Sequence, residues 1–231
     1  MAAIELLNTP LFDDPTLQVY YRFEGNSNDS KNSNNGTATA VTYSSGNGKF
    51  GEGVGFDETI PSNVALPYQI PFGDFSMTFW VKGTSSGFPT MFQSNDISLN
   101  EIMGITAGGA GTGVPSFVIF SSDTNIYQAS AVTNVFDGNF HMITCTLNSS
   151  TGEQLIYVDG VSEGNTTFAG DFPTSDNSAI GNPFDFGGSE AIDEFAIFTS
   201  VLSPTNISNL FNGTFPPSGP VTSPTFLFNL I

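Results

Sequence analysis

Alternation of apolar and polar residues with a period of two dominates the middle of the chain. Successive side chains of a strand point to opposite sides, and in segment 141–147 one such side carries His141, Ile143, Cys145 and Leu147. A second alternating segment, 154–158, follows the turn-forming residues 148–152 and ends at Asp159-Gly160. That pair is typical of tight hairpin turns. The pattern predicts two antiparallel strands and a hairpin turn at 159–160.

Further strands follow from the same period. The first is expected to direct Leu17, Val19, Tyr21 and Phe23 to the core. Segment 75–82 directs Phe75, Met77, Phe79 and Val81 inward, which leaves Trp80, the sole tryptophan, on the opposite face. Residues 25–48 are expected to be a polar loop, and 64–67 a short edge strand that ends at a proline. Ser203 followed by Pro204 predicts the N-cap and first position of a short helix that reaches Phe211.

The two ends of the chain differ from the segment between them. Apolar residues in 1–16 are interrupted by Pro10 and Pro15, which predicts an arm laid on a surface rather than a helix. Residues 17–213 are expected to form the domain. Residues 214–231 combine a proline-rich connector with an apolar tail whose docking residues would be Phe226, Phe228 and Leu230. Exposed, such a tail promotes aggregation, so we expect it to dock on its own domain or on a neighbour.

Four segments in order resemble laminin-G-like, concanavalin-A-like jelly-roll domains. Residues 20–25 resemble the family's opening strand, 75–82 its "fTvsaWvk" strand, and 191–198 with Leu202-Ser203-Pro204 its closing "IDEvriyn…LS". Segment 136–160, "DGNFHMITCTL…GEQLIYVDG", resembles the family's centre, with Phe140 where tryptophan is usual. The resemblance implies an all-β fold, a two-sheet antiparallel jelly-roll sandwich whose first and last strands pair. This fold serves lectins, hydrolases, adhesion modules and virion proteins alike.

Charge and composition exclude several classes of function. The 231 residues include 22 acidic and four basic side chains, for a net charge of −18. Binding to nucleic acid or to an anionic membrane needs a basic face, so neither is expected. No apolar run is long enough to insert into a bilayer, and no signal peptide opens the sequence. The single cysteine, Cys145, permits no intrachain disulfide.

A cation site is the first candidate for a functional site. The resemblance places the end of the first strand beside the start of the last, where family members often carry calcium. The candidate ligands are Glu24, Asn26, Asp29 and Asp193, because carboxylate and amide oxygens are what Ca²⁺ takes. In the alternative interpretation, Asp193 accepts backbone hydrogen bonds from the long loop and no metal binds. Both interpretations stay open at the level of the sequence.

Catalysis is not expected. Hydrolases of this fold carry acids as Glu-x-Asp-x-x-Glu along one strand, whereas segment 190–194 has Ile192 at the middle position. Glu190 and Glu194 would lie about 13 Å apart along a strand, beyond the separations that either mechanism of glycoside hydrolysis uses. His141 has no serine or cysteine nucleophile motif beside it, so we expect a structural histidine.

A glycan or partner contact is the remaining candidate. Trp80 would stack on a sugar if its sheet face were exposed, and would be structural if a loop covered it. Asn125 and Tyr127, in a polar loop region, are the other contact residues that we predict. Nothing in the pattern selects one loop over another, because polar turn residues are the ordinary content of such loops.

Taken together, these features predict a non-catalytic structural or interaction protein on a lectin-like sandwich. The first hypothesis is a virion component, a capsid decoration or a tail- or fibre-associated subunit, whose partners are capsid or tail proteins or copies of itself. It would be made in a host cytoplasm. The alternative is an extracellular or cell-surface module that binds glycans, with or without calcium. A glycoside hydrolase is a distant third.

Overall fold

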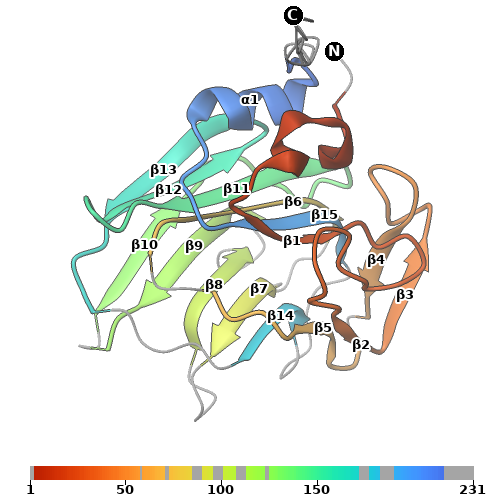
Figure 1. Cartoon of the computed structure of the whole chain (residues 1–231). Coiled ribbons are helices and arrows are strands. Elements are labelled where there is room, and N and C mark those ends of the chain that lie inside the picture. Colours follow the sequence, from red (N-terminus) through yellow and green to blue (C-terminus); the bar gives the residue numbers. More distant parts are fainter. Residues whose placement is uncertain are drawn as a thin grey trace, which may run out of the picture.

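The computed structural model describes residues 3–57, 59–70, 73–84, 90–95, 101–107, 113–122, 125–171, 177–182 and 190–215. These residues fold into two antiparallel β-sheets stacked as a sandwich (Figure 1). The all-β jelly-roll prediction is therefore confirmed, and the first and last strands pair as expected.

Sheet A has eight strands in the described residues, in the order β13-β12-β11-β6-β15-β4-β3, with β1 pairing beside β15. Their bounds are β1 Leu17–Tyr21, β3 Val41–Ser44, β4 Gly53–Phe56, β6 Phe75–Gly83, β11 His141–Leu147, β12 Glu153–Val158, β13 Val161–Thr167 and β15 Glu190–Phe198. The turn between β12 and β13 is the predicted hairpin, with Asp159 at φ 52° and Gly160 at φ 80°, the left-handed values that such turns need.

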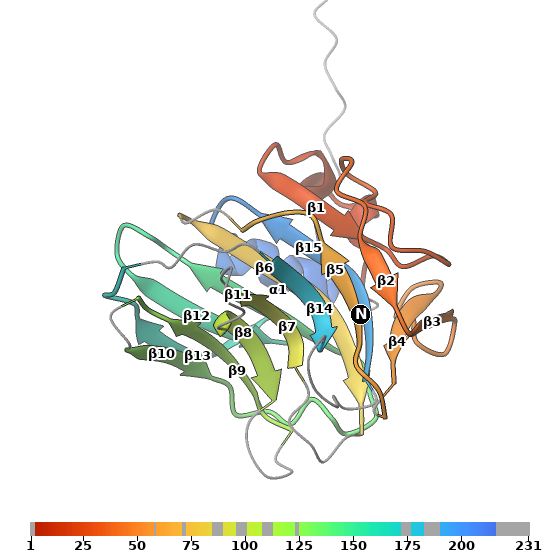
Figure 2. The ribbon, with the colours of Figure 1, turned by 90° about the horizontal axis from the view of Figure 1, so that it is seen from below.

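Sheet B has seven strands in the described residues, in the order β10-β9-β8-β7-β14-β5-β2. Their bounds are β2 Thr37–Thr39, β5 Ser62–Leu66, β7 Thr90–Asn95, β8 Glu101–Ala107, β9 Pro115–Phe120, β10 Ile126–Ser130 and β14 Asn177–Asn182. Figure 2 shows the two layers from below.

The inner core fills the space between the sheets. Phe195 of β15 lies at its centre, with ring centroids 5.7 Å from Phe79 of β6 and 5.8 Å from Phe92 of β7, both nearly parallel. Buried aromatic rings contribute the largest share of apolar burial per residue. Cys145 is part of the same core, and burial raises the pKa of its thiol well above the ordinary value.

A second apolar cluster, which we call the outer cluster, covers the outer face of sheet A. It includes Leu6 and Leu11 from two short 3₁₀ helices, η1 (Leu6–Asn8) and η2 (Pro10–Asp13), and Ile207 and Leu210 from α1 (Pro204–Asn212). Figure 1 shows α1 and the N-terminal segment side by side on this face. Among the described residues, no helix has the length and apolar character that crossing a bilayer takes.

The helix α1 is bounded as predicted. The Ser203 hydroxyl accepts a hydrogen bond from the Asn206 amide at 3.1 Å, and Pro204 occupies the first turn. Gly213 ends the helix at φ 65°, a left-handed conformation that glycine adopts without strain.

Three local predictions were wrong. The polar loop 25–48 contains β2 and β3, whose exposed or half-exposed side chains leave no alternation to read. The strand at 64–67 is part of β5, which lies between β14 and β2 rather than at an edge. Leu17 belongs to the outer cluster, because the register of β1 against β15 shifts between Leu17 and Val19.

Candidate ligand-binding groove

Strand β15 is central to the site because it pairs with three other strands. One edge pairs with β6; the other pairs first with β4 and then with β1. A β-bulge interrupts the β6 pairing between Asp193 and Ala196, and Glu194 adopts φ 54° there. Ile192 and Phe195 both face the inner core, so Asp193 and Glu194 both lie on the outer side of the bulge.

Glu194 holds the N-terminal arm against sheet A. Its Oε2 accepts a hydrogen bond from the Leu6 amide at 3.1 Å and another from the Tyr20 hydroxyl. Burial raises the pKa of Glu194 to about 8, and the pKa of Tyr20 also rises because it is buried beside that carboxyl. These contacts make Glu194 a structural anchor.

Asp193 holds the loop that precedes β4. Its Oδ2 accepts hydrogen bonds from the Lys49 amide at 2.8 Å and the Phe50 amide at 2.9 Å. Its Oδ1 accepts from the Glu194 amide at 2.9 Å. Burial raises the pKa of Asp193 to about 7, although these three hydrogen bonds oppose the shift.

The remaining predicted metal ligands are also engaged with the chain itself. Asp29 Oδ1 accepts from the Tyr20 amide at 3.0 Å and the Lys31 amide at 2.9 Å. Glu24 lies near Asp193, as predicted, since its charge helps raise the pKa of Asp193, but its Oε2 accepts from the Glu52 amide at 3.2 Å. Asn26 Oδ1 accepts from the Asn28 amide at 2.8 Å, within its own turn.

This donor set does not fit a shared calcium ion. Ca²⁺ takes six to eight oxygens, whereas the oxygens of Asp29 and Asp193 already accept backbone amides. The described residues contain no group of three or more His, Cys, Asp or Glu side chains arranged around a common point. The contacts of Asp193 instead match the alternative interpretation, in which it accepts hydrogen bonds from the long loop.

Trp80 lies on the outer face of sheet A, but its ring is only 3% exposed. Phe211 of α1 stacks on it with centroids 5.8 Å apart, and Phe50 packs edge-on at 6.1 Å. Lys49 Nζ lies 4.3 Å from the ring centroid. Of the two interpretations of Trp80, the exposed contact is therefore wrong, and the structural residue under a covering loop matches the structure, because α1 and the loop before β4 cover the ring.

Asn125 and Tyr127 lie on the other sheet. Tyr127 of β10 packs against the inner core, with its ring centroid 4.9 Å from that of Phe168. The Asn125 carbonyl accepts from the Ser121 amide at 2.9 Å in the turn between β9 and β10. These two residues therefore do not form a common site with Trp80, which lies on sheet A. The tail residues Phe226, Phe228 and Leu230 lie outside the described residues.

His141 bridges two turns. Its Nδ1 lies 2.8 Å from Asp159 Oδ2 and its Nε2 lies 3.2 Å from Asp137 Oδ1. The hydrogen bond with Asp159 raises the pKa of His141 above its ordinary value, and Asp137 adds to the effect. The histidine therefore ties the β12–β13 turn to the turn before β11, as a structural residue does.

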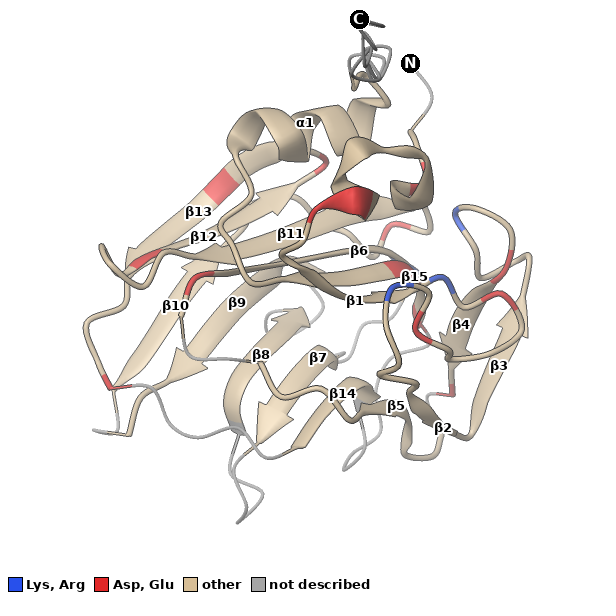
Figure 3. Cartoon of the chain, in the orientation of Figure 1, with Lys and Arg blue, Asp and Glu red and all other residues tan. Residues whose placement is uncertain are grey.

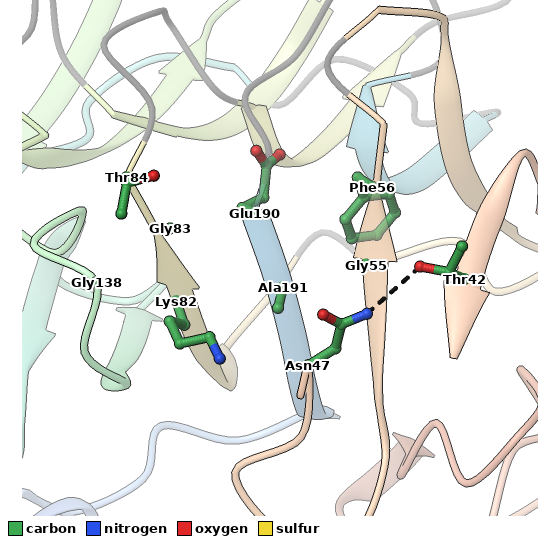
Figure 4. Close-up of a pocket in the computed structure, with 10 residues that line it drawn as sticks. All are labelled: Thr42, Asn47, Gly55, Phe56, Lys82, Gly83, Thr84, Gly138, Glu190 and Ala191. Atoms are coloured by element: carbon green, nitrogen blue, oxygen red, sulfur yellow. Dashed lines mark hydrogen bonds between the residues drawn. The ribbon is translucent and has the colours of Figure 1, made fainter. Parts of the chain in front are cut away.

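A groove of about 270 Å³ opens where β6, β15 and β4 lie side by side (Figure 4). Its floor is formed by small residues on paired strands, because Ala191 of β15 pairs with Gly55 of β4. The groove is lined by Thr42, Asn47, Gly55, Phe56, Lys82, Gly83, Thr84, Gly138, Glu190 and Ala191.

Glu190 is the distinctive residue of this groove. Its side chain is 2% exposed, and neither carboxyl oxygen has a hydrogen-bond partner in any other described residue. Burial raises its pKa to about 8, so the carboxyl is largely protonated at neutral pH. Its own backbone amide opposes this rise, and burying such a group without another partner costs about 1–3 kcal/mol.

Lys82 lies away from the Glu190 carboxyl, towards the other end of the groove (Figure 4). Its ammonium donates a hydrogen bond to the Gly46 carbonyl and stands 4.7 Å from the ring centroid of Phe140. Asn47 Nδ2 donates to the Thr42 hydroxyl at 3.4 Å on the opposite wall. Acidic residues are spread over the molecule, whereas the basic residues visible in Figure 3 lie on the side that carries β1, β3 and β4.

The pattern of the sequence does not predict this groove. Glu190 lies two residues before Ile192 and so points to the same side of the strand, where alternation would place an apolar residue. An acid at such a position is unusual, and it could have indicated a functional residue. The contributions of Thr42 and Asn47 depend on strand β3, which the sequence pattern did not reveal.

A two-sheet sandwich with a polar groove beside its closing strand defines a lectin-like β-sandwich protein. A family model described as the concanavalin A-like lectin/glucanases superfamily matches residues 57–208. The chain belongs to this family, as the laminin-G-like resemblance predicted. No curated protein sequence matches the chain.

Similar solved structures share the fold at low sequence identity. The binding domain of Paraclostridial Mosquitocidal Protein 1 is 16% identical, with a TM-score of 0.70 over 86% of this chain and 52% of its own. Domain 4 of AbnA, a GH43 extracellular arabinanase from Geobacillus stearothermophilus solved with arabinotriose, is 22% identical. Its TM-score is 0.67, over 84% of this chain and 98% of its own.

The ligand binding domain of botulinum neurotoxin serotype D, solved with N-acetylneuraminic acid, is 13% identical. Its TM-score is 0.64, over 86% of this chain and 51% of its own. This chain therefore spans about half the length of the toxin domains that it matches.

Proposed function

We propose that this protein is a non-catalytic carbohydrate-binding module that holds its ligand in the groove beside β15. The observation that carries the proposal is Glu190, a buried carboxyl that lines an open groove without a partner in the other described residues. Sites for small polar ligands combine a concave surface with a few converging polar groups. A ligand hydroxyl would supply the missing hydrogen bonds and offset the cost of burying the acid.

The comparisons support this proposal through the fold. Domain 4 of the arabinanase matches this chain over nearly its whole length and was solved with arabinotriose. The serotype D domain was solved with N-acetylneuraminic acid, but only about half of it is matched. The arabinanase domain is therefore the better guide to the ligand class.

A binding role agrees with the arrangement of the acids on β15. Glu190 lines the groove, Asp193 holds the loop before β4, and Glu194 anchors the arm. Two carboxyl groups that cleave a glycosidic bond must face one substrate at a defined separation. These three acids have separate surroundings instead.

Blocking the groove tests the proposal. Thr42 is an exposed residue of the short strand β3 that lines the groove, so Thr42→Trp would fill it with a side chain that strands accept. Thr39→Trp is the matched control, because Thr39 is exposed on the short strand β2 of the other sheet. A glycan array would select ligands, and calorimetric titration would measure affinity. We expect Thr42→Trp to weaken binding at least about tenfold; equal affinity in both variants would remove the groove from the proposal.

The assembly hypothesis is a second candidate, with a virion subunit as its specific form. Its support is the outer cluster, to which both the N-terminal segment and Phe215 contribute immediately before the apolar tail of the sequence. Deleting 216–231 would keep Phe215 in place and is expected to weaken assembly while the sandwich stays folded. Sedimentation of the native source material with particles, read by mass spectrometry, would support a particle subunit, and recovery only in the unassembled fraction would count against it.

A further inference from the structure

We propose that the groove selects a neutral sugar ring, held at Glu190 through two adjacent hydroxyl groups, over a sugar that carries a carboxylate. The inference rests on the proposed function and names the ligand class of the same site. It also decides between two kinds of ligand, the neutral arabinotriose and the acidic N-acetylneuraminic acid, seen with similar folds.

The Glu190 carboxyl lacks a hydrogen-bond partner in the other described residues. A protonated carboxyl has one O–H donor and further acceptor capacity, while each sugar hydroxyl donates one hydrogen bond and accepts others. Two neighbouring hydroxyls therefore satisfy both carboxyl oxygens at once. Neither oxygen has a partner in any other described residue, so the ligand would complete the hydrogen bonding.

A carboxylate on the ligand would be unfavourable beside Glu190. Placed beside Glu190, it would put a second acid into a partly dehydrated groove of a chain that carries a net charge of −18. A carboxylate that loses its hydration without an opposite charge beside it is strongly disfavoured, and the neutral acid of Glu190 supplies no such charge. The buried position of Glu190 thus disfavours an acidic sugar at this end of the groove.

Lys82 is the other ionisable residue among those described as lining the groove. Its ammonium is already committed to the Gly46 carbonyl and to the face of Phe140. Lys82 is half-buried, but its hydrogen bond to Gly46 is exposed to solvent, and exposed ion pairs contribute at most about 1 kcal/mol. Lys82 is therefore a weak attractor for a carboxylate and does not offset the effect of Glu190.

The floor of the groove combines small residues with the amide of Asn47. A side chain at Gly55 would meet Asn47 Nδ2 at 2.2 Å, so the Asn47 amide lies over Gly55 and requires glycine there. Ala191 beside it adds only a methyl group, and the Phe56 ring forms one wall. Sites for small ligands commonly combine such apolar surface with a few placed polar groups.

The test compares neutral sugars with sugars that carry a carboxylate. Arabinotriose and a glucose oligosaccharide serve as the neutral probes; N-acetylneuraminic acid and the matching glucuronate oligosaccharide serve as the acidic probes. Each is titrated into the full chain at pH 6.5 by calorimetry and by ligand-observed NMR. We expect at least one neutral probe to bind at least about tenfold more tightly than either acidic probe.

Two variants test whether Glu190 is the residue that holds the sugar. Glu190→Gln keeps a donor and an acceptor, and we expect affinity within about threefold of wild type. Glu190→Met keeps the volume but removes both polar atoms; because it also removes an unpartnered buried acid, it should fold, and we expect at least a tenfold loss of affinity.

Preferred binding of acidic probes, lost in Lys82→Ala and kept in Glu190→Met, would overturn the inference and leave the proposed function standing. Binding of neutral probes that is unchanged in Glu190→Met would also overturn it. Failure of every sugar to bind, on the array and in titration, would instead defeat the proposed function itself.

Discussion

Trp80 and Phe211 stack with their ring planes 27° apart and their centroids separated by 5.8 Å. One residue belongs to the central strand β6 and the other to the C-terminal helix α1. The contact closes the outer face of sheet A over the only tryptophan of the chain. Tryptophan fluorescence therefore reports directly on whether α1 is docked.

Phe211→Ala is expected to expose Trp80 and to shift its fluorescence to longer wavelength. The half-buried ring should contribute about 1–2 kcal/mol to the free energy of unfolding. Phe12→Ala is the matched control: Phe12 packs on Tyr20 at 6.0 Å in the same outer cluster but does not stack on Trp80. An equal spectral shift in both variants would show that α1 does not specifically cover the tryptophan.

Two neighbouring leucines test the docking of the N-terminal arm. Leu6 is 2% exposed in the outer cluster, whereas Leu7 beside it is 36% exposed. Leu6→Ala should lower the free energy of unfolding by about 2–4 kcal/mol, because it leaves a cavity under the arm. Leu7→Ala should change it by less than about 0.5 kcal/mol. Chemical denaturation measures both, and similar losses for the two variants would contradict the observed packing.

The sequence predicted the fold because strand alternation and hairpin chemistry are local. Phe79 and the turn at Asp159 have the surroundings that the pattern indicated. The segment that covers Trp80 was not predictable in the same way, because α1 lies far along the chain from β6. Period-two alternation also gave no warning of the bulge, which places Asp193 and Glu194 on one side of β15.

Millimolar calcium is expected to leave the melting temperature unchanged relative to a chelator baseline. The oxygens of Asp29 and Asp193 accept backbone amides, and a cation would have to displace those hydrogen bonds. A ligand that binds only the folded state at 100 times its Kd stabilises it by about 2.7 kcal/mol. Differential scanning calorimetry would detect such a gain, and a calcium-dependent rise would restore the metal hypothesis.

Glu190 is expected to make stability depend on pH in a specific direction. Burial raises its pKa in the folded state to about 8, above the ordinary value near 4.5. The folded protein therefore holds this proton more tightly than the unfolded chain does. The associated stability is fully present below the unfolded pKa and is lost as the pH rises through the folded pKa.

Asp193 and Glu194 titrate in the same range, with pKa values raised to about 7 and about 8 by burial. A Glu190→Gln variant separates the contributions, because it retains both of those acids and removes only one titration. Relative to wild type, the variant should gain about 2–4 kcal/mol of unfolding free energy between pH 5 and pH 9. Denaturant unfolding at the two pH values measures this difference. Parallel pH profiles for the two proteins would mean that Glu190 already has a partner in the folded protein, and the groove would then lack the unsatisfied group on which its ligand recognition depends.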